Sequence, residues 1–225
     1  MKTVLHLNSS ARTERSHTRY LTKLFVKEWR SLRPDDLLIS RDVGTEPPPP
    51  VNEVWIAAAF TPPQNRTSAM REVLRLSDLL VDELIRADLI VLGAPMYNFG
   101  MPAQLKAYVD QIVRVGRTFS LDVANEKQPY EPLLTGKRML VITATGDAGY
   151  QPGGPLVHMN HLDPHIRTVF GFIGIRNVHF VGVNYDEFPD DRISRSLATA
   201  EATIKQRACA LAHDWSAERE NISAV

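Results

Sequence analysis

The sequence has little cysteine and no excess of charge of either sign. A single cysteine, Cys209, excludes an internal disulfide bond and is typical of a reducing compartment, so we expect a cytoplasmic protein. The 26 basic residues equal the 26 acidic ones, which argues against a nucleic-acid surface or a polybasic membrane patch. The N-terminal apolar run is too short for a signal peptide, and no window approaches a membrane span. We therefore expect a protein that binds neither nucleic acid nor membrane.

Several signatures of functional sites are also missing. There is no GxGxxG or GxxxxGK[ST] pattern, which excludes the common dinucleotide-binding and P-loop turns. A hydrolase with a nucleophile elbow would need GxSxG, and that pattern is absent too. His158, His161 and His165 lie close together with Asp163, but Pro164 interrupts the run and no cysteine assists. We expect no metal site, because the specific zinc motifs have more tightly defined signatures.

Short apolar runs alternate with amphipathic stretches along the chain. This alternation specifies an α/β fold with a parallel sheet. Without a linker or an internal repeat, we expect a single domain over residues 1–225, although the pattern alone does not give the strand order. The predicted strands are 3–7, 37–40, 89–93, 139–143 and 178–183. The predicted helices are 16–32, 54–60, 65–86, 102–114 with Pro102 in its first turn, one that ends near 170, and 193–215, and residues 116–136 are expected to be irregular. The helix over 65–86 is expected to have one apolar face, formed by Ala69, Val73, Leu76, Leu80 and Leu84.

The stretch 89–114 (LIVLGAPMYNFGMPAQLKAYVDQIVR) combines a buried strand, a loop and an amphipathic helix. Because ligands of open α/β sheets bind beyond the carboxyl ends of strands, the loop Met96 to Gly100 is a candidate site. Tyr97 and Phe99 can stack on a planar ring, and Asn98 can donate and accept hydrogen bonds. Alternatively, Phe99 only plugs the end of the sheet.

Two further loops follow predicted strands. Residues 8–16 offer serine and threonine hydroxyls at a helix N-terminus, where free backbone N–H groups and the helix dipole favour a phosphate. The alternative is an ordinary serine N-cap in a polar loop. The glycine-rich segment around Gly146 and Gly149 allows a close backbone approach to a ligand, or simply marks a turn.

Three segments together resemble the FMN-dependent NADH azoreductases, also described as quinone reductases, of the flavodoxin-like superfamily. They are LHLNSSARTERSHT at the N-terminus, APMYNFGMPAQLKAYVDQIVRVGRTF in the middle and GFIGI at 171–175. The similarity spans nearly the whole chain, and MYNF in this context is a specific motif. The resemblance implies a three-layer flavodoxin-like sandwich with a five-stranded parallel sheet of order 2-1-3-4-5, and a homodimer with FMN near the subunit interface.

The resemblance also assigns residues to the cofactor. Ser10, Ser16, His17 and Thr18 would surround the FMN phosphate, and Met96, Tyr97, Asn98 and Phe99 would border the ribityl chain and the isoalloxazine. The loop Ala144, Thr145, Gly146 and Asp147 would lie at the flavin edge. The family usually has Ser-Arg-Gly-Gly there, so only Gly146 matches, and His17 replaces a more usual glutamine.

The implied activity is a two-step hydride relay. NADH or NADPH reduces the flavin and leaves, and a quinone or an azo compound is then reduced at the same face. The flavin carries the chemistry, so no catalytic acid–base side chain is expected. The proline-rich segment 47–63 is a candidate wall of the substrate pocket. The alternatives are an electron-transfer flavodoxin, which the balanced charge disfavours, and a flavin-free binding module.

Overall fold

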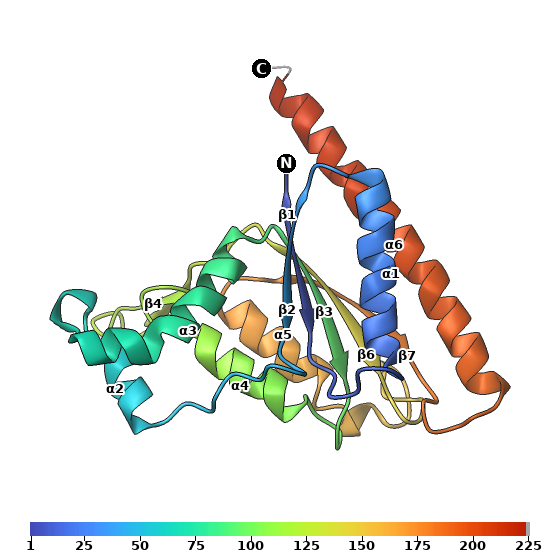
Figure 1. The fold of residues 1–225 in the computed structure, drawn as a ribbon, viewed down its shortest axis with the longest axis horizontal. Helices are drawn as coiled ribbons and strands as arrows, with labels where there is room; N and C mark the ends of the chain where they lie inside the picture. The colour runs from blue at the N-terminus through green and yellow to red at the C-terminus, as the bar shows by residue number, and fades with distance from the viewer. Residues whose placement is uncertain (224–225) are drawn as a thin grey trace.

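The protein is built on a five-stranded parallel sheet, seen in a computed structural model that describes residues 1–223. The sheet order is β2-β1-β3-β6-β7. The strands are β1 (Thr3–Asn8), β2 (Leu37–Asp42), β3 (Leu89–Pro95), β6 (Arg138–Ala144) and β7 (Asn177–Val183). All five run in the same direction, so their carboxyl ends meet at one edge of the sheet, at the bottom of Figure 1.

The predicted strand order 2-1-3-4-5 is corrected by two strands that the sequence pattern did not reveal. β4 (Phe119–Leu121) and β5 (Tyr130–Pro132) form a separate antiparallel pair, so the last two sheet strands are the sixth and seventh along the chain. They lie in the segment 116–136, which was expected to be irregular. At three residues each, these strands are too short for a recognisable alternation of apolar and polar residues.

Helices cover both faces of the sheet, as Figure 1 shows. α1 (His17–Leu32) and α6 (Asp191–Ser223) pack on one face, against Val4, Leu89 and Val91. On the other face, α3 (Ser68–Arg86), α4 (Ala103–Ile112) and α5 (Asp163–Phe172) pack against Ile90 and Leu92. Because successive strand residues point to opposite faces, β3 supplies both cores and is buried along its whole length. This explains why its sequence is uniformly apolar.

The helices differ from expectation at three points. The helix predicted over 65–86 begins at Ser68, after a short turn at Pro63–Asn65. Its predicted apolar face included Ala69 and Val73, which are exposed, whereas Leu80 and Leu84 are buried as expected. Pro102 lies at the N-cap of α4 rather than in its first turn. α2 (Glu53–Phe60) confirms the short helix predicted over 54–60.

The membrane-spanning potential of the described helices is low. Within residues 1–223, none of them is both long and apolar enough to cross a bilayer.

Candidate functional site

A cavity of about 270 Å³ lies at the carboxyl ends of the sheet strands. The loops after β1, β3, β6 and β7 all contribute to its lining. Nine of the twelve residues predicted for cofactor binding line it: Ser10, Ser16, His17, Thr18, Met96, Tyr97, Asn98, Ala144 and Gly146. The structure therefore brings together three segments of the sequence, the first and last of which lie more than a hundred residues apart.

The first loop ends at the N-terminus of α1, which faces the cavity. Ser16 is the N-cap, and its Oγ accepts a hydrogen bond from the backbone N–H of Arg19 at 3.3 Å. Ser16 and Thr18 are both buried, and their hydroxyls lie 3.2 Å apart. The first turn of α1 contains no acidic residue. Because the first N–H groups of a helix lack partners within the helix and carry partial positive charge, this end of the cavity favours an anion.

Arg19 holds the first loop in place. Its Nη2 donates to the carbonyl oxygen of Ser10 at 2.6 Å, and its Nε donates to that of Arg12 at 2.7 Å. The same guanidinium forms a bidentate ion pair with the carboxylate of Asp42 at the end of β2. Partial burial raises the pKa of Asp42, but the hydrogen bond and charge of Arg19 outweigh it, so the pKa lies below its usual value. Asp42 is therefore anionic at neutral pH and anchors the bracing arginine.

The loop after β3 is a tight turn with a strained backbone. Tyr97 and Gly100 exchange backbone hydrogen bonds of 2.9 and 3.1 Å. Between them, Asn98 and Phe99 both have positive φ angles, of 47° and 68°. Two central residues with positive φ make a type I′ turn, which suits asparagine but not a bulky aromatic residue. The strain is of order 1–3 kcal/mol and is typical of functional loops.

Backbone and side-chain hydrogen bonds connect the three loops. The backbone N–H of Met96 donates to the carbonyl oxygen of Ala144 at 2.9 Å. The hydroxyl of Tyr97 accepts a hydrogen bond from the backbone N–H of Ala11 at 3.2 Å. The turn after β3 is thereby joined to the loop after β6 on one side and to the first loop on the other.

Three predicted residues do not line this cavity: Phe99, Thr145 and Asp147. The Phe99 ring lies against Tyr150, with centroids 6.5 Å apart, and is 42% exposed, so it does not plug the sheet end. Thr145 is buried and donates to the carbonyl oxygen of Asp147 at 2.6 Å. The Asp147 side chain accepts from the backbone N–H of Ala148 at 2.7 Å. These two residues therefore shape their own loop.

Gly146 shows how closely the loops after β6 and β7 approach each other. A Cβ at this position would lie 2.6 Å from the carboxyl carbon of Glu187. The backbone N–H of Glu187 also donates to the carbonyl oxygen of Gly146 at 3.2 Å. The missing side chain of Gly146 therefore lets Glu187 pack closely at the cavity wall, whereas the close approach of this loop to a ligand stays a prediction.

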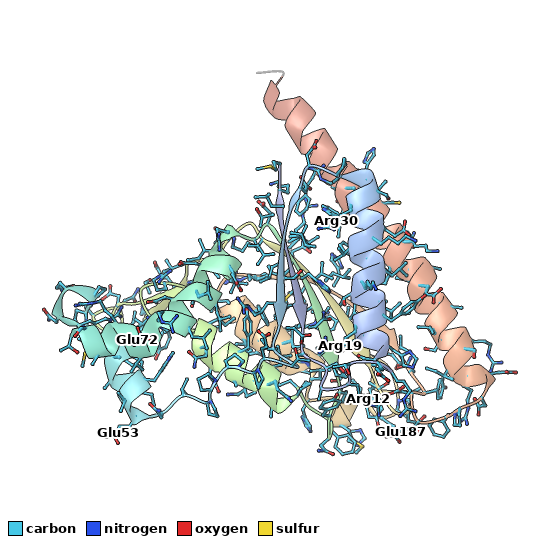
Figure 2. All side chains as sticks on the ribbon, viewed as in Figure 1. Arg12, Arg19, Arg30, Glu53, Glu72 and Glu187 are labelled. Carbon is cyan, nitrogen blue, oxygen red and sulfur yellow. The ribbon has the colours of Figure 1, made fainter. Side chains whose placement is uncertain are left out.

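The sequence prediction missed five residues that line the cavity: Arg12, Arg15, Pro95, Asp186 and Glu187. Figure 2 shows Arg12, Arg19 and Glu187 together at the carboxyl end of the sheet. Asp186 and Glu187 directly follow the last predicted strand. Because ligands of open α/β sheets bind beyond the carboxyl ends of the strands, the position of both residues directly after the last strand is the sequence signal that points to them.

Segment 47–63 lies away from the cavity in this chain. α2 packs beside α3 and α4, where the indole Nε1 of Trp55 donates to Oε1 of Gln111 at 2.9 Å. The amide Nε2 of Gln111 in turn donates to the carbonyl oxygen of Pro49 at 3.0 Å. Glu53 of this segment lies far from Arg12 in Figure 2, and none of the cavity-lining residues comes from the segment. The prediction that it walls the pocket does not hold within one chain.

Comparisons with known proteins agree with this geometry. A family model described as flavodoxin-like fold matches residues 2–208. The FMN-dependent NADH:quinone oxidoreductase of Opitutus terrae is 48% identical over 205 residues, covering 91% of this chain and 96% of the relative. The FMN-dependent NAD(P)H:quinone oxidoreductase 1 of Pseudomonas aeruginosa is 44% identical over 211 residues, covering 90% and 100%.

Among solved structures, the azoreductase of Bacillus anthracis superposes with a TM-score of 0.82 at 21% identity, over 92% of this chain and 99% of that one. At that identity, the structural match supports the fold. The family assignment rests on the closer sequence relatives and on the matched model. The chain thus belongs to the family of FMN-dependent NADH:quinone oxidoreductases and azoreductases, within the flavodoxin-like superfamily.

Proposed function

We propose that this chain is an FMN-dependent NAD(P)H oxidoreductase that reduces quinones and cleaves aromatic azo bonds by ping-pong hydride transfer. The observation that carries the proposal is the convergence of residues assigned to the cofactor on one cavity at the carboxyl edge of the sheet. This is the place where open α/β sheets bind ligands. The names of the relatives support the same reaction class.

The phosphate end of FMN fits the N-terminus of α1. The hydroxyls of Ser10, Ser16 and Thr18 line the cavity there, and the helix adds free N–H groups without an acidic residue in its first turn. His17 and Arg12 supply positive or hydrogen-bonding groups beside them. A phosphate monoester needs this combination of donors and cations.

The ring end of FMN fits the turn after β3 and the loop after β6. Met96 and Tyr97 line the cavity beside Ala144 and Gly146. The positive φ angles of Asn98 and Phe99 set the direction of two successive backbone N–H groups. Such N–H groups stabilise negative charge on a bound ring without reorganising. FMN, when bound, supplies the group that accepts and gives up the hydride.

The residues of this chain bind and orient rather than transfer protons. We assign no catalytic acid or base among them. NADH or NADPH and the oxidising substrate use the open side of the cavity in turn, which gives ping-pong kinetics. Unlike an electron-transfer flavodoxin, the chain has no net negative charge for docking a redox partner.

The deciding experiment is anaerobic mixing of the FMN-loaded chain with NADH and, separately, NADPH. We expect flavin absorbance to bleach with at least one of them and to return when a benzoquinone or an aromatic azo dye is added. A chain that takes up FMN but is not reduced by either nicotinamide would be an electron carrier. A chain that takes up no FMN would be a binding module of another kind.

We also propose that residues 1–225 form one domain, that the protein is cytoplasmic, and that it functions as a homodimer. Apolar side chains exposed on α2 support the dimer: Val54, Ile56 and Phe60 are 60%, 47% and 62% exposed. Exposed apolar side chains gathered on one short helix are typical of an interaction surface. Light scattering of the purified chain tests this assembly, because a monomeric mass would exclude it.

A further inference from the structure

Two carboxylates lie in a cavity whose other polar groups suit an anion. They belong to Asp186 and Glu187, in the loop after β7. Oδ2 of Asp186 accepts from Nη1 of Arg12 at 2.8 Å, and its Oδ1 lies 3.1 Å from Nε2 of His17. The Asp186 side chain is only 22% exposed. One shielded carboxylate therefore holds both of these side chains at the phosphate end of the cavity.

The loop that carries Asp186 is fixed in place. Its backbone N–H donates to the carbonyl oxygen of Thr145 at 3.0 Å. The preceding residue, Tyr185, has a φ of 69°, and its carbonyl oxygen accepts from the N–H of Phe188 at 3.0 Å. A non-glycine residue keeps such a conformation only where the surrounding structure determines it. The carboxylate is therefore a built part of the cavity.

We propose that Asp186 competes with the phosphate of FMN for Arg12 and His17, and so limits how strongly the cavity prefers FMN over riboflavin. The proposal rests on the proposed function, in which this cavity binds FMN. A phosphate monoester carries a charge of about −1.5 to −2 at pH 7 and seeks the same donors as a carboxylate. Asp186 both engages those donors and repels the phosphate.

The proposed competition predicts the direction in which the affinity for FMN changes when Asp186 is replaced. Replacing Asp186 by asparagine removes the negative charge, frees the Arg12 guanidinium from its ion pair and adds an amide that can donate to the phosphate. A carboxylate that instead served to orient Arg12 and His17 for the phosphate would have the opposite effect, because its loss would disorder both side chains. The two roles are thus distinguished by the direction of the change in affinity.

The test is equilibrium dialysis of the flavin-stripped full chain against FMN and against riboflavin. We expect D186N to bind FMN about tenfold more tightly than the unsubstituted chain, with riboflavin binding changed less than about twofold. D186E, which keeps the charge, should retain the original ratio. D190N is the matched control: Asp190 lies in the same loop and pairs with Arg192, but it does not line the cavity, so both affinities should stay unchanged.

Weaker FMN binding in D186N would overturn the proposal, and so would an equal change for FMN and riboflavin. Failure of the proposed function is a different result, in which the unsubstituted chain binds neither flavin. In that case the affinity for inorganic phosphate is measured instead, and D186N should bind it more tightly than the unsubstituted chain. Phosphate binding that is unchanged or weaker would overturn the proposal independently of any flavin.

Discussion

The two ends of the cavity keep their shape by different means. The first loop is held by one side chain, Arg19, which spans two carbonyl oxygens and an ion pair with Asp42. The turn after β3 is held by its own backbone, which closes between Tyr97 and Gly100 at the cost of two positive φ angles. The part of the cavity at the first loop, where we propose that the FMN phosphate binds, should therefore respond to changes in charge and pH. The part at the turn after β3, where we propose that the flavin ring binds, should respond to changes in backbone freedom.

The largest expected effect comes from removing the side chain that holds the first loop. Arg19→Ala should weaken FMN binding about a hundredfold, because Asp42 loses its partner and the carbonyl oxygens of Ser10 and Arg12 lose their donors. Titration of the flavin-stripped chain with FMN measures the change. Arg30→Ala removes an exposed arginine from the far end of the same helix, away from the cavity, and should leave FMN affinity unchanged (Figure 2). Equal losses in both variants would refute the bracing role of Arg19.

The next effect tests the strained turn. Asn98→Ala should weaken FMN binding about tenfold or slow flavin reduction to a similar extent, because alanine tolerates a positive φ poorly and lacks the amide. Asn98→Gly restores the backbone freedom without the amide, so the difference between the two variants separates geometry from hydrogen bonding. Cofactor content and turnover that match the unsubstituted chain in both variants would remove Asn98 from the site.

A smaller effect should appear in the pH dependence of stability. The pKa of Asp42 is lowered below 3.8 in the folded chain, with Arg19 outweighing the opposing effect of burial. A lowered pKa stabilises the fold above the unfolded value, and the contribution is lost as the pH falls from about 4 through the folded pKa. Chemical unfolding between pH 5 and pH 2 should therefore show a shallower loss of stability in Asp42→Asn. An unchanged slope would show that the ion pair contributes nothing measurable.

The smallest effect concerns the strain itself. Phe99→Gly should raise the free energy of unfolding by up to about 1 kcal/mol, because glycine adopts a positive φ without strain and Phe99, which is 42% exposed, is not part of the buried core. Gly100→Ala is the control, since a Cβ there meets nothing within 4 Å and the residue has no positive φ. Denaturant titration measures both. Marked destabilisation by Phe99→Gly would show that the ring contact with Tyr150 outweighs the strain.

The sequence predicts the fold well where local patterns are strong. The uninterrupted apolar run of β3 and the alternating faces of the long helices are set by burial, which local composition records. The face of α3 was harder to predict. At 3.6 residues per turn Ala69 and Val73 lie on the same side of the helix as Leu80 and Leu84, yet the first two are exposed and the last two are buried. The first half of α3 instead packs through Leu74 against α2, a contact between elements that the spacing alone does not reveal.

The candidate site was predicted less completely because its contacts join distant parts of the chain. No local pattern pairs Arg12 with Asp186, which lie 174 residues apart. Likewise, the direction of the Phe99 ring follows from the left-handed backbone of the turn, which the sequence of the turn does not predict. The prediction that Ser10, Ser16 and His17 surround the phosphate came from the family resemblance, since the loop alone favours a plain N-cap.

The hydrogen bond between the Tyr97 hydroxyl and the Ala11 backbone has one further consequence. Because it joins the first loop to the turn after β3, we expect that ordering one loop lowers the entropy cost of ordering the other. A ligand that fills both ends then gains more free energy than the sum of two fragments that fill one end each. The cavity should therefore bind a whole mononucleotide more tightly than the affinities of its separate ring and phosphate fragments would together give.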